Sequence, residues 1–243
     1  SNFDECQKFG KSMFADKDFC KSINMSGVNS INWSRIVCQI VYYFYSYFKL
    51  QKDNLSFSVP TGNFGDIFAG YVAKKMGLPI DKLIVATNEN DILQRVINSG
   101  EYKPHTVKPS ITPSMDIQVA SNFERLLFYI LDENDQKVSK LMNDLSLKGS
   151  FNLDKEVVKK IKKDFEAVRI NDEDTQKIIK NIDDKHQFIL DPHTATGFGA
   201  ANKVKGLKNV VVLGTAHPYK FNDTIEKVTG KSLKAPKHLK MYI

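Results

Sequence analysis

Apolar residues along this chain follow two spacings, and each spacing predicts a different kind of element. Helical spacing, in which apolar side chains recur every three or four residues, runs through residues 31–49 and predicts a buried amphipathic helix. Short apolar runs at residues 55–59, 83–87 and 210–213 predict buried strands. The apolar positions of the predicted helix are Trp33, Ile36, Val37, Ile40, Val41, Phe44 and Phe48.

Further helices are predicted between and after these strands, at residues 66–76, about 90–99, 121–131 and about 194–204. A strand, a helix and a second strand in this order imply a parallel βαβ unit with a right-handed crossover. We therefore predict an α/β fold, with an open, largely parallel twisted sheet and flanking helices.

The segment 134–184 interrupts this order, because it is rich in lysine and aspartate and is typical of several charged helices. The sequence leaves open whether this segment is a helical insertion or a subdomain. We therefore expect residues 1–133 and residues 185–243 to build the α/β part, with residues 134–184 between them.

Composition narrows the class of protein. With 243 residues, 42% hydrophobic residues and 16 Phe, the chain can bury a substantial core. The net charge of +7 does not indicate nucleic-acid binding, because only four of the 35 basic residues are arginine and they form no cluster with aromatic residues. The sequence contains no apolar run of about twenty residues that would predict a membrane span.

The first residues and the cysteines bear on the cellular compartment. Residues 1–20 are polar and charged, unlike a secretory signal. Cys6, Cys20 and Cys38 are odd in number and lie outside the spacings of metal sites. We therefore expect reduced thiols in a cytoplasmic protein, and no metal site.

The loop at residues 60–66 is the most informative stretch for chemistry. Gly62 and Gly65 would let the backbone approach an anion closely, and the N–H groups of the loop and of the following helix suit phosphate oxygens. Asp66 would lie near the positive end of that helix. The loop lacks both the GxGxxG of dinucleotide-binding folds and the Gly-Lys-Ser/Thr of nucleotide-binding loops. From these residues alone, an anion-binding turn and a plain tight turn are equally open.

A second loop, at residues 214–218, follows the strand predicted at residues 210–213. Open α/β sheets bind ligands beyond the carboxyl ends of their strands. We therefore expect the two loops to line one crevice.

Six stretches along the chain carry a resemblance to a known family. They are VNSINWSR (28–35), VPTGNFGD (59–66), SITPSMDIQ (110–118), SNFER (121–125), DPHTA (191–195) and GTAHPYKF (214–221). In this order they resemble the threonine synthases, which are fold type II pyridoxal-phosphate enzymes, over nearly the whole chain. The resemblance implies a tryptophan-synthase-β-like fold whose N-terminal part is missing here, and pyridoxal 5'-phosphate as the cofactor.

The resemblance also implies roles for single residues. Thr215 would face the pyridine nitrogen, where a neutral hydroxyl leaves that nitrogen weakly protonated; a strand-end hydroxyl bonded to loop backbone is the alternative. Arg35 would bind the substrate phosphate, because its guanidinium can form two parallel hydrogen bonds; capping or pairing on its own helix is the alternative. The residues implied for the substrate are Ser30, Asn32, Arg35 and Asn63. Those implied for the cofactor phosphate are Thr61, Gly62, Asn63, Phe64, Gly65 and Asp66.

Four other residues in the matched stretches have open roles. We expect His193 to be structural, while His217 is either structural or part of the site. For Asp116 and Arg125 we expect an ion pair that holds the loop, with contact to the active site as the alternative.

The resemblance implies the conversion of O-phospho-L-homoserine and water into L-threonine and phosphate. In the family, the lysine that holds the cofactor lies in an aromatic-Lys-Asp context, which Lys17 between Asp16 and Asp18 does not match. We therefore expect that lysine upstream, no catalytic residue within this chain, and little turnover by the chain alone. Two alternatives stay open: a threonine-synthase-like phospho-lyase that acts on phosphorylated amino acids, and a non-catalytic anion-binding fragment.

Overall fold

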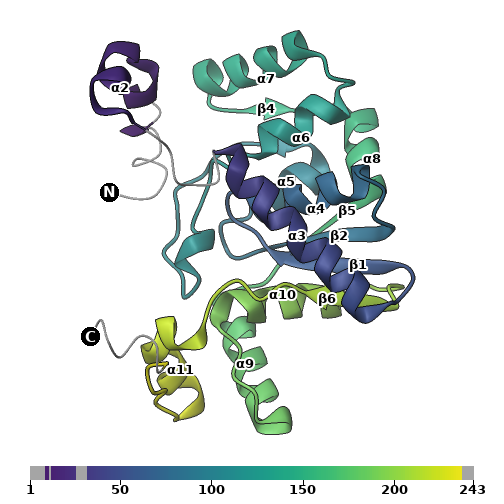
Figure 1. Cartoon of the computed structure of the whole chain (residues 1–243), viewed down its shortest axis with the longest axis vertical. Helices are drawn as coiled ribbons and strands as arrows, with labels where there is room; N and C mark the ends of the chain where they lie inside the picture. Colours follow the sequence, from purple (N-terminus) through teal and green to yellow (C-terminus); the bar gives the residue numbers. More distant parts are fainter. Residues whose placement is uncertain (1–8, 11, 26–31, 237–243) are drawn as a thin grey trace.

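A four-stranded parallel sheet forms the centre of the fold (Figure 1). The computed structural model describes residues 9–10, 12–25 and 32–236. The strands lie in the order β5-β2-β1-β6. They are β1 (Leu55–Pro60), β2 (Ile80–Thr87), β5 (Phe165–Arg169) and β6 (Asn209–Val212). All neighbouring pairs are parallel, so the predicted parallel sheet is confirmed and the carboxyl ends of its strands share one edge.

Helices cover both faces of this sheet. The described helices are α2 (Lys17–Ile23), α3 (Trp33–Leu50), α4 (Gly65–Lys75), α5 (Ile92–Ser99), α6 (Phe123–Ile130), α7 (Asp135–Lys148), α8 (Lys155–Asp164), α9 (Asp172–His186), α10 (Pro192–Lys203) and α11 (Asn222–Thr229), with the 3-10 helices η1 (Pro113–Met115) and η2 (Pro218–Phe221). A short antiparallel pair joins β3 (Glu101–Tyr102) to β4 (Phe151–Asn152). Within the described ranges, no helix is long and apolar enough to cross a membrane.

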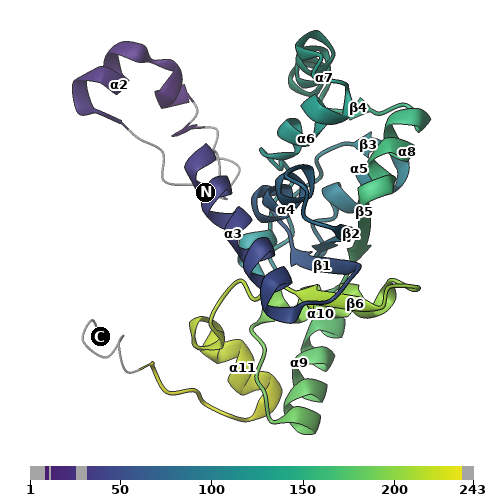
Figure 2. The same cartoon turned by 45° about the vertical axis from the view of Figure 1, so that its right-hand side comes forward.

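The larger core lies between the sheet and the helices α3 to α8, on one face (Figure 2). Alternate strand residues point to this face: Phe57 of β1 pairs with Leu83 of β2 and Val211 of β6, and all three belong to or pack against this core. Tyr43 brings α3 onto the same core, because its ring centroid lies 4.8 Å from that of Phe57. This alternation explains why a short apolar and polar pattern predicted β1 correctly.

The opposite face is covered by α10, with α9 behind it (Figure 2). Ser58 points to this face, and its hydroxyl donates a hydrogen bond to the carbonyl of Gly197 in α10, 2.6 Å away. A second, smaller core joins Ile84, Ala86 and Ala200. Small residues on α10 therefore let this helix pack directly on the strands that carry the loops of interest.

The helix predicted at residues 31–49 is present as α3, but the prediction that it is buried was too broad. Ile36, Ile40 and Tyr43 are its buried residues. Val37 and Val41 on the other flank are 46% and 60% exposed. Helical spacing identifies the element, but it does not show how wide a stripe its partners cover.

The segment 134–184 contains the predicted helices, as α7, α8 and α9, and also the edge strand β5. This strand pairs with β2 along residues 165–169, so the segment completes the sheet as well as covering it. The strand was missed because its five residues follow a lysine-rich helix directly. The division into residues 1–133, 134–184 and 185–243 stays a prediction.

Candidate functional site

A small cavity lies at the carboxyl ends of β1 and β6, where the two glycine-containing loops meet. Its volume is about 110 Å³. The residues around it are Pro60, Gly62, Ser114, Met115, His193, Thr215, Ala216 and Lys220. Gly62 comes from the first loop and Thr215 from the second, so the prediction that both loops line one crevice is confirmed. The physical reason is the pairing of β1 with β6, which brings their carboxyl ends together.

The loop after β1 is fixed to the sheet before it turns into α4. The Thr61 N–H donates to the carbonyl of Ala86, at 2.8 Å, and its hydroxyl donates to the carbonyl of Val59, at 2.6 Å. Phe64 then takes a left-handed backbone with φ of 63° at the N-cap of α4. Its ring is buried, 5.4 Å from that of Phe123, and this packing holds the unusual backbone in place.

The N-terminus of α4 is open in a way that suits an anion. Among the described residues, no side chain forms a capping hydrogen bond to its first turn. Uncapped N–H groups at a helix N-terminus carry partial positive charge and accept an anion readily. The open N-terminus of α4 is compatible with a bound phosphate, and the phosphate contacts of this loop stay a prediction.

Gly62 owes its identity to a protein contact. A Cβ on Gly62 would lie 2.6 Å from the carbonyl oxygen of Ser114 and 3.1 Å from the Cα of Met115. Both are backbone atoms of the η1 segment, which cannot move as freely as a side-chain end. Glycine at this position therefore lets two chain segments approach each other, in addition to any role toward an anion.

Asn63 ties the same loop to the start of α6. Its side-chain Oδ1 accepts a hydrogen bond from the Ser121 N–H at 2.8 Å. Its backbone carbonyl accepts from the N–H of Asn122, at 3.2 Å, and from the side-chain amide of Asn122, at 3.1 Å. Asn63 thus has a clear structural role beside the predicted contact with the substrate.

Asp66 lies in the first turn of α4, as expected, but it also contacts α3. The hydroxyl of Tyr43 donates to the backbone carbonyl of Asp66 at 2.8 Å and lies 3.4 Å from its Oδ1. Burial raises the pKa of Asp66 from 3.8 to about 6, and the hydrogen bond from Tyr43 offsets part of that rise. Burial, with the nearby Asp66 charge, also raises the pKa of Tyr43 well above its usual value.

The described residues predicted for the substrate, Asn32, Arg35 and Asn63, are not among those that line the cavity, although Asn63 directly follows Gly62. Ser30 lies outside the described residues. Asn32 is the N-cap of α3, where its side chain accepts from the Ser34 N–H at 3.0 Å, and Arg35 is exposed one turn into the same helix. The capping role that the sequence left open for Arg35 thus belongs to Asn32.

The histidines of the matched stretches differ in their surroundings. His193 is buried, with 3% of its surface exposed, and its Nε2 accepts the N–H of Ser114 at 3.3 Å. His217 is exposed and caps η2 by accepting the N–H of Tyr219 at its Nδ1. A structural role therefore accounts for both, although His193 also borders the cavity.

The expected ion pair between Asp116 and Arg125 is wrong. Asp116 instead accepts hydrogen bonds from the side-chain amides of Asn88, at 2.7 Å, and Asn90, at 3.0 Å. Arg125 bonds to Asn122 and lies over the ring of Trp33, 5.4 Å from its centroid. The two side chains contact different parts of the chain. The sequence motifs in which they lie do not show which side chains meet in the folded protein.

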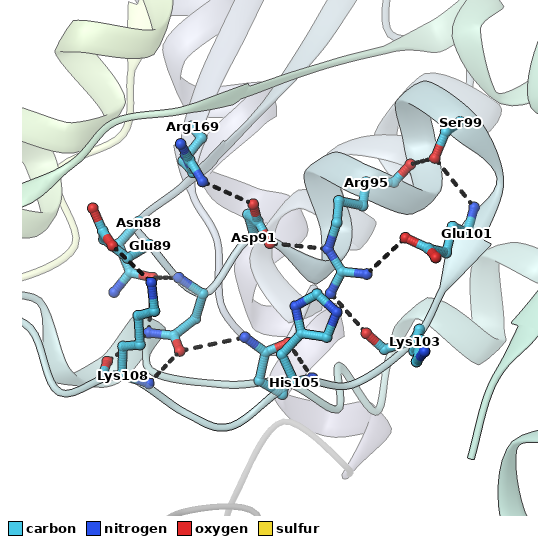
Figure 3. Close-up of polar contacts among 12 residues, drawn as sticks. Asn88, Glu89, Asp91, Arg95, Ser99, Glu101, Lys103, His105, Lys108 and Arg169 are labelled. Atoms are coloured by element: carbon cyan, nitrogen blue, oxygen red, sulfur yellow. Dashed lines mark hydrogen bonds and ion pairs between the residues drawn. The ribbon is translucent and has the colours of Figure 1, made fainter.

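The loop that carries Ser114 is held at the carboxyl end of β2 by residues that sequence reasoning missed. Figure 3 shows Asp91 between Arg95 and Arg169, while Arg95 also reaches Glu101 and the carbonyl of Lys103; the distances from Asp91 to the two arginines are 3.0 Å and 3.1 Å. Arg95 thus holds the start of this loop at Lys103, and the side-chain amide of Asn90 holds it further on by donating to the carbonyl of Lys108, 2.9 Å away. A signal was present, because the polar run at residues 88–91 directly follows a strand predicted to end at this edge.

Comparison with known proteins places these features in a family. A family model described as "Threonine synthase, C-terminal" matches residues 194–242. Threonine synthase of Pseudomonas aeruginosa is 46% identical over 243 residues, which cover 98% of this chain and 52% of that protein. Threonine synthase of Saccharomyces cerevisiae is 45% identical over 247 residues, covering 92% of this chain and 48% of that protein. The chain thus spans about half the length of these relatives.

Solved structures of threonine synthases are also similar to this chain. A pyridoxal-phosphate-bound threonine synthase from Brucella melitensis superposes with a TM-score of 0.91 at 46% identity, covering 98% of this chain and 52% of that one. The yeast threonine synthase gives a TM-score of 0.85 at 41% identity, covering 99% and 53%. The chain is therefore similar over nearly its whole length to about half of a threonine synthase, and its residues 194–242 match the C-terminal part of that family.

Proposed function

We propose that this chain is part of a pyridoxal-phosphate-dependent lyase that converts O-phospho-L-homoserine and water into L-threonine and phosphate. The observation that carries this proposal is the cavity that joins Gly62 to Thr215, because the family likeness alone does not say which groups of this chain meet. Its setting would be threonine biosynthesis in the cytoplasm, with a small molecule as the only partner that the chemistry requires.

The cofactor would lie across the two loops at this cavity. Its phosphate would bind to backbone N–H groups at the uncapped N-terminus of α4 and in the loop before it. Thr215, at the other loop, would face the pyridine nitrogen with a neutral hydroxyl. When bound, pyridoxal phosphate supplies the electron sink that acidifies the substrate carbons next to its amino group. The proposed cofactor residues are Thr61, Gly62, Asn63, Phe64, Gly65, Asp66 and Thr215.

The residues of this chain would bind and orient the groups that react. Thr61 anchors the loop to β1 and β2, and Asn63 anchors it to α6, so the loop is already rigid before a ligand arrives. A rigid backbone cradle binds phosphate without an ordering cost. For the substrate we propose Ser30, Asn32, Arg35 and Asn63. The lysine that holds the cofactor stays predicted upstream of this chain.

The intact gene product tests the reaction directly. Incubated with pyridoxal phosphate and O-phospho-L-homoserine, it should release L-threonine and inorganic phosphate in equal amounts. Release of phosphate with a keto acid and no threonine would overturn the synthase assignment in favour of a phospho-lyase. Release of neither product, from a protein that binds the cofactor, would remove the assignment to this substrate.

A matched pair of variants at basic residues of α3 tests the substrate residues in the same intact protein. Arg35→Gln should raise KM for O-phospho-L-homoserine by about tenfold or more, because a guanidinium bond to a phosphate is among the stronger polar contacts. Lys49→Gln is the control, since Lys49 is an exposed basic residue in the last turn of the same helix, at the opposite end of α3 from Arg35. Equal KM values in both variants would refute the role of Arg35.

A further inference from the structure

The buried carboxylate of Asp191 stands at the centre of the cavity's supporting contacts. Asp191 is the N-cap of α10, and its Oδ1 accepts the N–H groups of His193, at 2.9 Å, and Thr194, at 3.3 Å. Its side chain is 2% exposed. Burial alone would raise the pKa of Asp191, but the hydrogen bonds from His193 and Thr194 outweigh burial and lower it. The group is therefore a permanently charged acceptor at neutral pH.

The first chain of hydrogen bonds runs from Asp191 to the second loop. The hydroxyl of Thr194 is within hydrogen-bonding distance of Asp191 Oδ2 and must donate to it, because a carboxylate can only accept. The remaining lone pairs of that hydroxyl then accept the N–H of Thr215, at 3.3 Å. Thr194 thus transmits the position of the carboxylate to the backbone of the residue proposed to face the cofactor ring.

The second chain runs from the same carboxylate to the opposite wall. His193 Nε2 accepts the N–H of Ser114 at 3.3 Å, so this nitrogen carries no proton. The proton of a neutral ring then lies on Nδ1, which is 3.4 Å from Asp191 Oδ1 and forms no hydrogen bond with the described residues. The hydrogen bond from His193 to the carboxylate is the one from its backbone N–H, at 2.9 Å. The ring of Phe221, with its centroid 4.9 Å away, holds the imidazole plane. His193 thus connects the carboxylate to η1, whose backbone touches Gly62.

We propose that Asp191, acting through Thr194 and His193, is the positioning residue that sets the distance between the two walls of the cofactor cavity. Both hydrogen-bond chains begin at one buried carboxylate and end at backbone N–H groups, of Thr215 on one wall and Ser114 on the other. A shift of the carboxylate would therefore move both walls together. This inference rests on the proposed function for its purpose, but its contacts can be tested without any reaction.

The hydrogen-bond chain through Thr194 has a matched control in the same helix. Thr196 is also buried in α10, but its hydroxyl donates to the carbonyl of Pro192 at 3.0 Å and lies near Thr175, away from the cavity. Thr194→Val should lower the hydrogen-exchange protection of the Thr215 amide about fivefold or more, because that amide loses its acceptor. Thr196→Val should leave the Thr215 amide unchanged, and Thr194→Ser, which restores a hydroxyl, should recover it.

The hydrogen-bond chain through His193 is tested in the same way, by hydrogen exchange of the Ser114 amide. His193→Leu removes the acceptor and should expose the Ser114 amide to exchange, while His193→Gln can place a carbonyl oxygen there and should protect it. Nitrogen-15 spectra of the wild-type ring should show the proton on Nδ1. The control is His186→Leu, an exposed histidine at the end of α9.

Binding of pyridoxine 5'-phosphate, which cannot react with a lysine, links these contacts to the cavity. By calorimetry on the full chain, Thr194→Val should bind this probe about fivefold more weakly than Thr196→Val. If the probe binds every variant equally, the positioning role is wrong. If the wild type does not bind the probe, the proposed cofactor site fails, and amide exchange alone decides the positioning role: unchanged Thr215 and Ser114 amides would overturn it.

Discussion

The carboxyl group of Asp66 offers a quantitative test of the candidate site, because two effects on it have opposite signs. Its place in the first turn of α4 favours the charged form through the helix dipole. Burial against α3 favours the neutral form and raises the pKa from 3.8 to about 6. Replacing Asp66 by Asn keeps the size and removes the charge, so this variant shows which effect is larger.

The magnitude follows from the size of the pKa shift. A rise of about two units corresponds to about 3 kcal/mol, at about 1.4 kcal/mol per unit. Asp66 keeps some exposed surface, so we expect about 1–3 kcal/mol in practice. Because the folded-state pKa of Asp66 is raised, its contribution to the free energy of unfolding is fully present below pH about 4. This contribution is lost as the pH rises to about 6.

Asp66→Asn should therefore match the wild type in stability near pH 4 and exceed it by about 1–3 kcal/mol above pH 7. Urea unfolding at a series of pH values, with the m-value checked for each protein, measures this difference. Asp81→Asn is the control, because Asp81 is exposed on β2 and should change little at any pH. A variant that is less stable than the wild type at pH 7.5 would show that the helix dipole outweighs burial and would refute the reasoning.

Three further predictions concern the cavity. Gly62→Ala should lower stability by about 1–3 kcal/mol in urea unfolding and weaken pyridoxine 5'-phosphate binding, because its Cβ meets the backbone of Ser114. Gly214→Ala is the control and should be tolerated, because its Cβ has no neighbour nearer than 4.0 Å. Equal stability of these two variants would contradict the predicted close approach. In the intact enzyme, Thr215→Val should shift the absorbance of the bound cofactor, while Thr229→Val, in α11, should not. Borohydride treatment after adding pyridoxal phosphate to this chain should leave no lysine labelled stoichiometrically, Lys220 included; full labelling at Lys220 would refute the prediction that the anchoring lysine lies upstream.

Much of the sheet could be predicted from the sequence because its strands are short, apolar and bounded by turn residues. The alternation of Phe57 and Val59 with Ser56 and Ser58 reflects two different faces, one toward the larger core and one toward α10. The strand β5 was missed because its pattern is brief and adjoins charged helices. The exposed flank of α3 could not be predicted, since which apolar residues meet a partner depends on elements far along the chain.

The cavity itself was predictable only as a meeting of two loops. Parallel strands bring their carboxyl ends together, so residues 61–65 and 214–218 had to share an edge once β1 and β6 paired. The hydrogen bond between His193 and Ser114 joins residues 79 positions apart, and no local pattern announces it. The meeting of the two loops therefore follows from the pairing of parallel strands, but the contacts that hold the loops in place depend on tertiary structure.

Two helix N-termini meet at this edge, and their different caps decide which of them can accept an anion. The first turn of α10 is already satisfied by its own carboxylate, because Asp191 accepts two of its N–H groups and occupies the place where an anion would bind. The first turn of α4 has the apolar Phe64 at the same position and, among the described residues, no side-chain cap. A second anion beside Asp191 would be repelled, whereas the first turn of α4 offers N–H groups that no side-chain cap among the described residues occupies. The proposed cofactor phosphate therefore belongs at α4, and α10 serves to hold the walls around it.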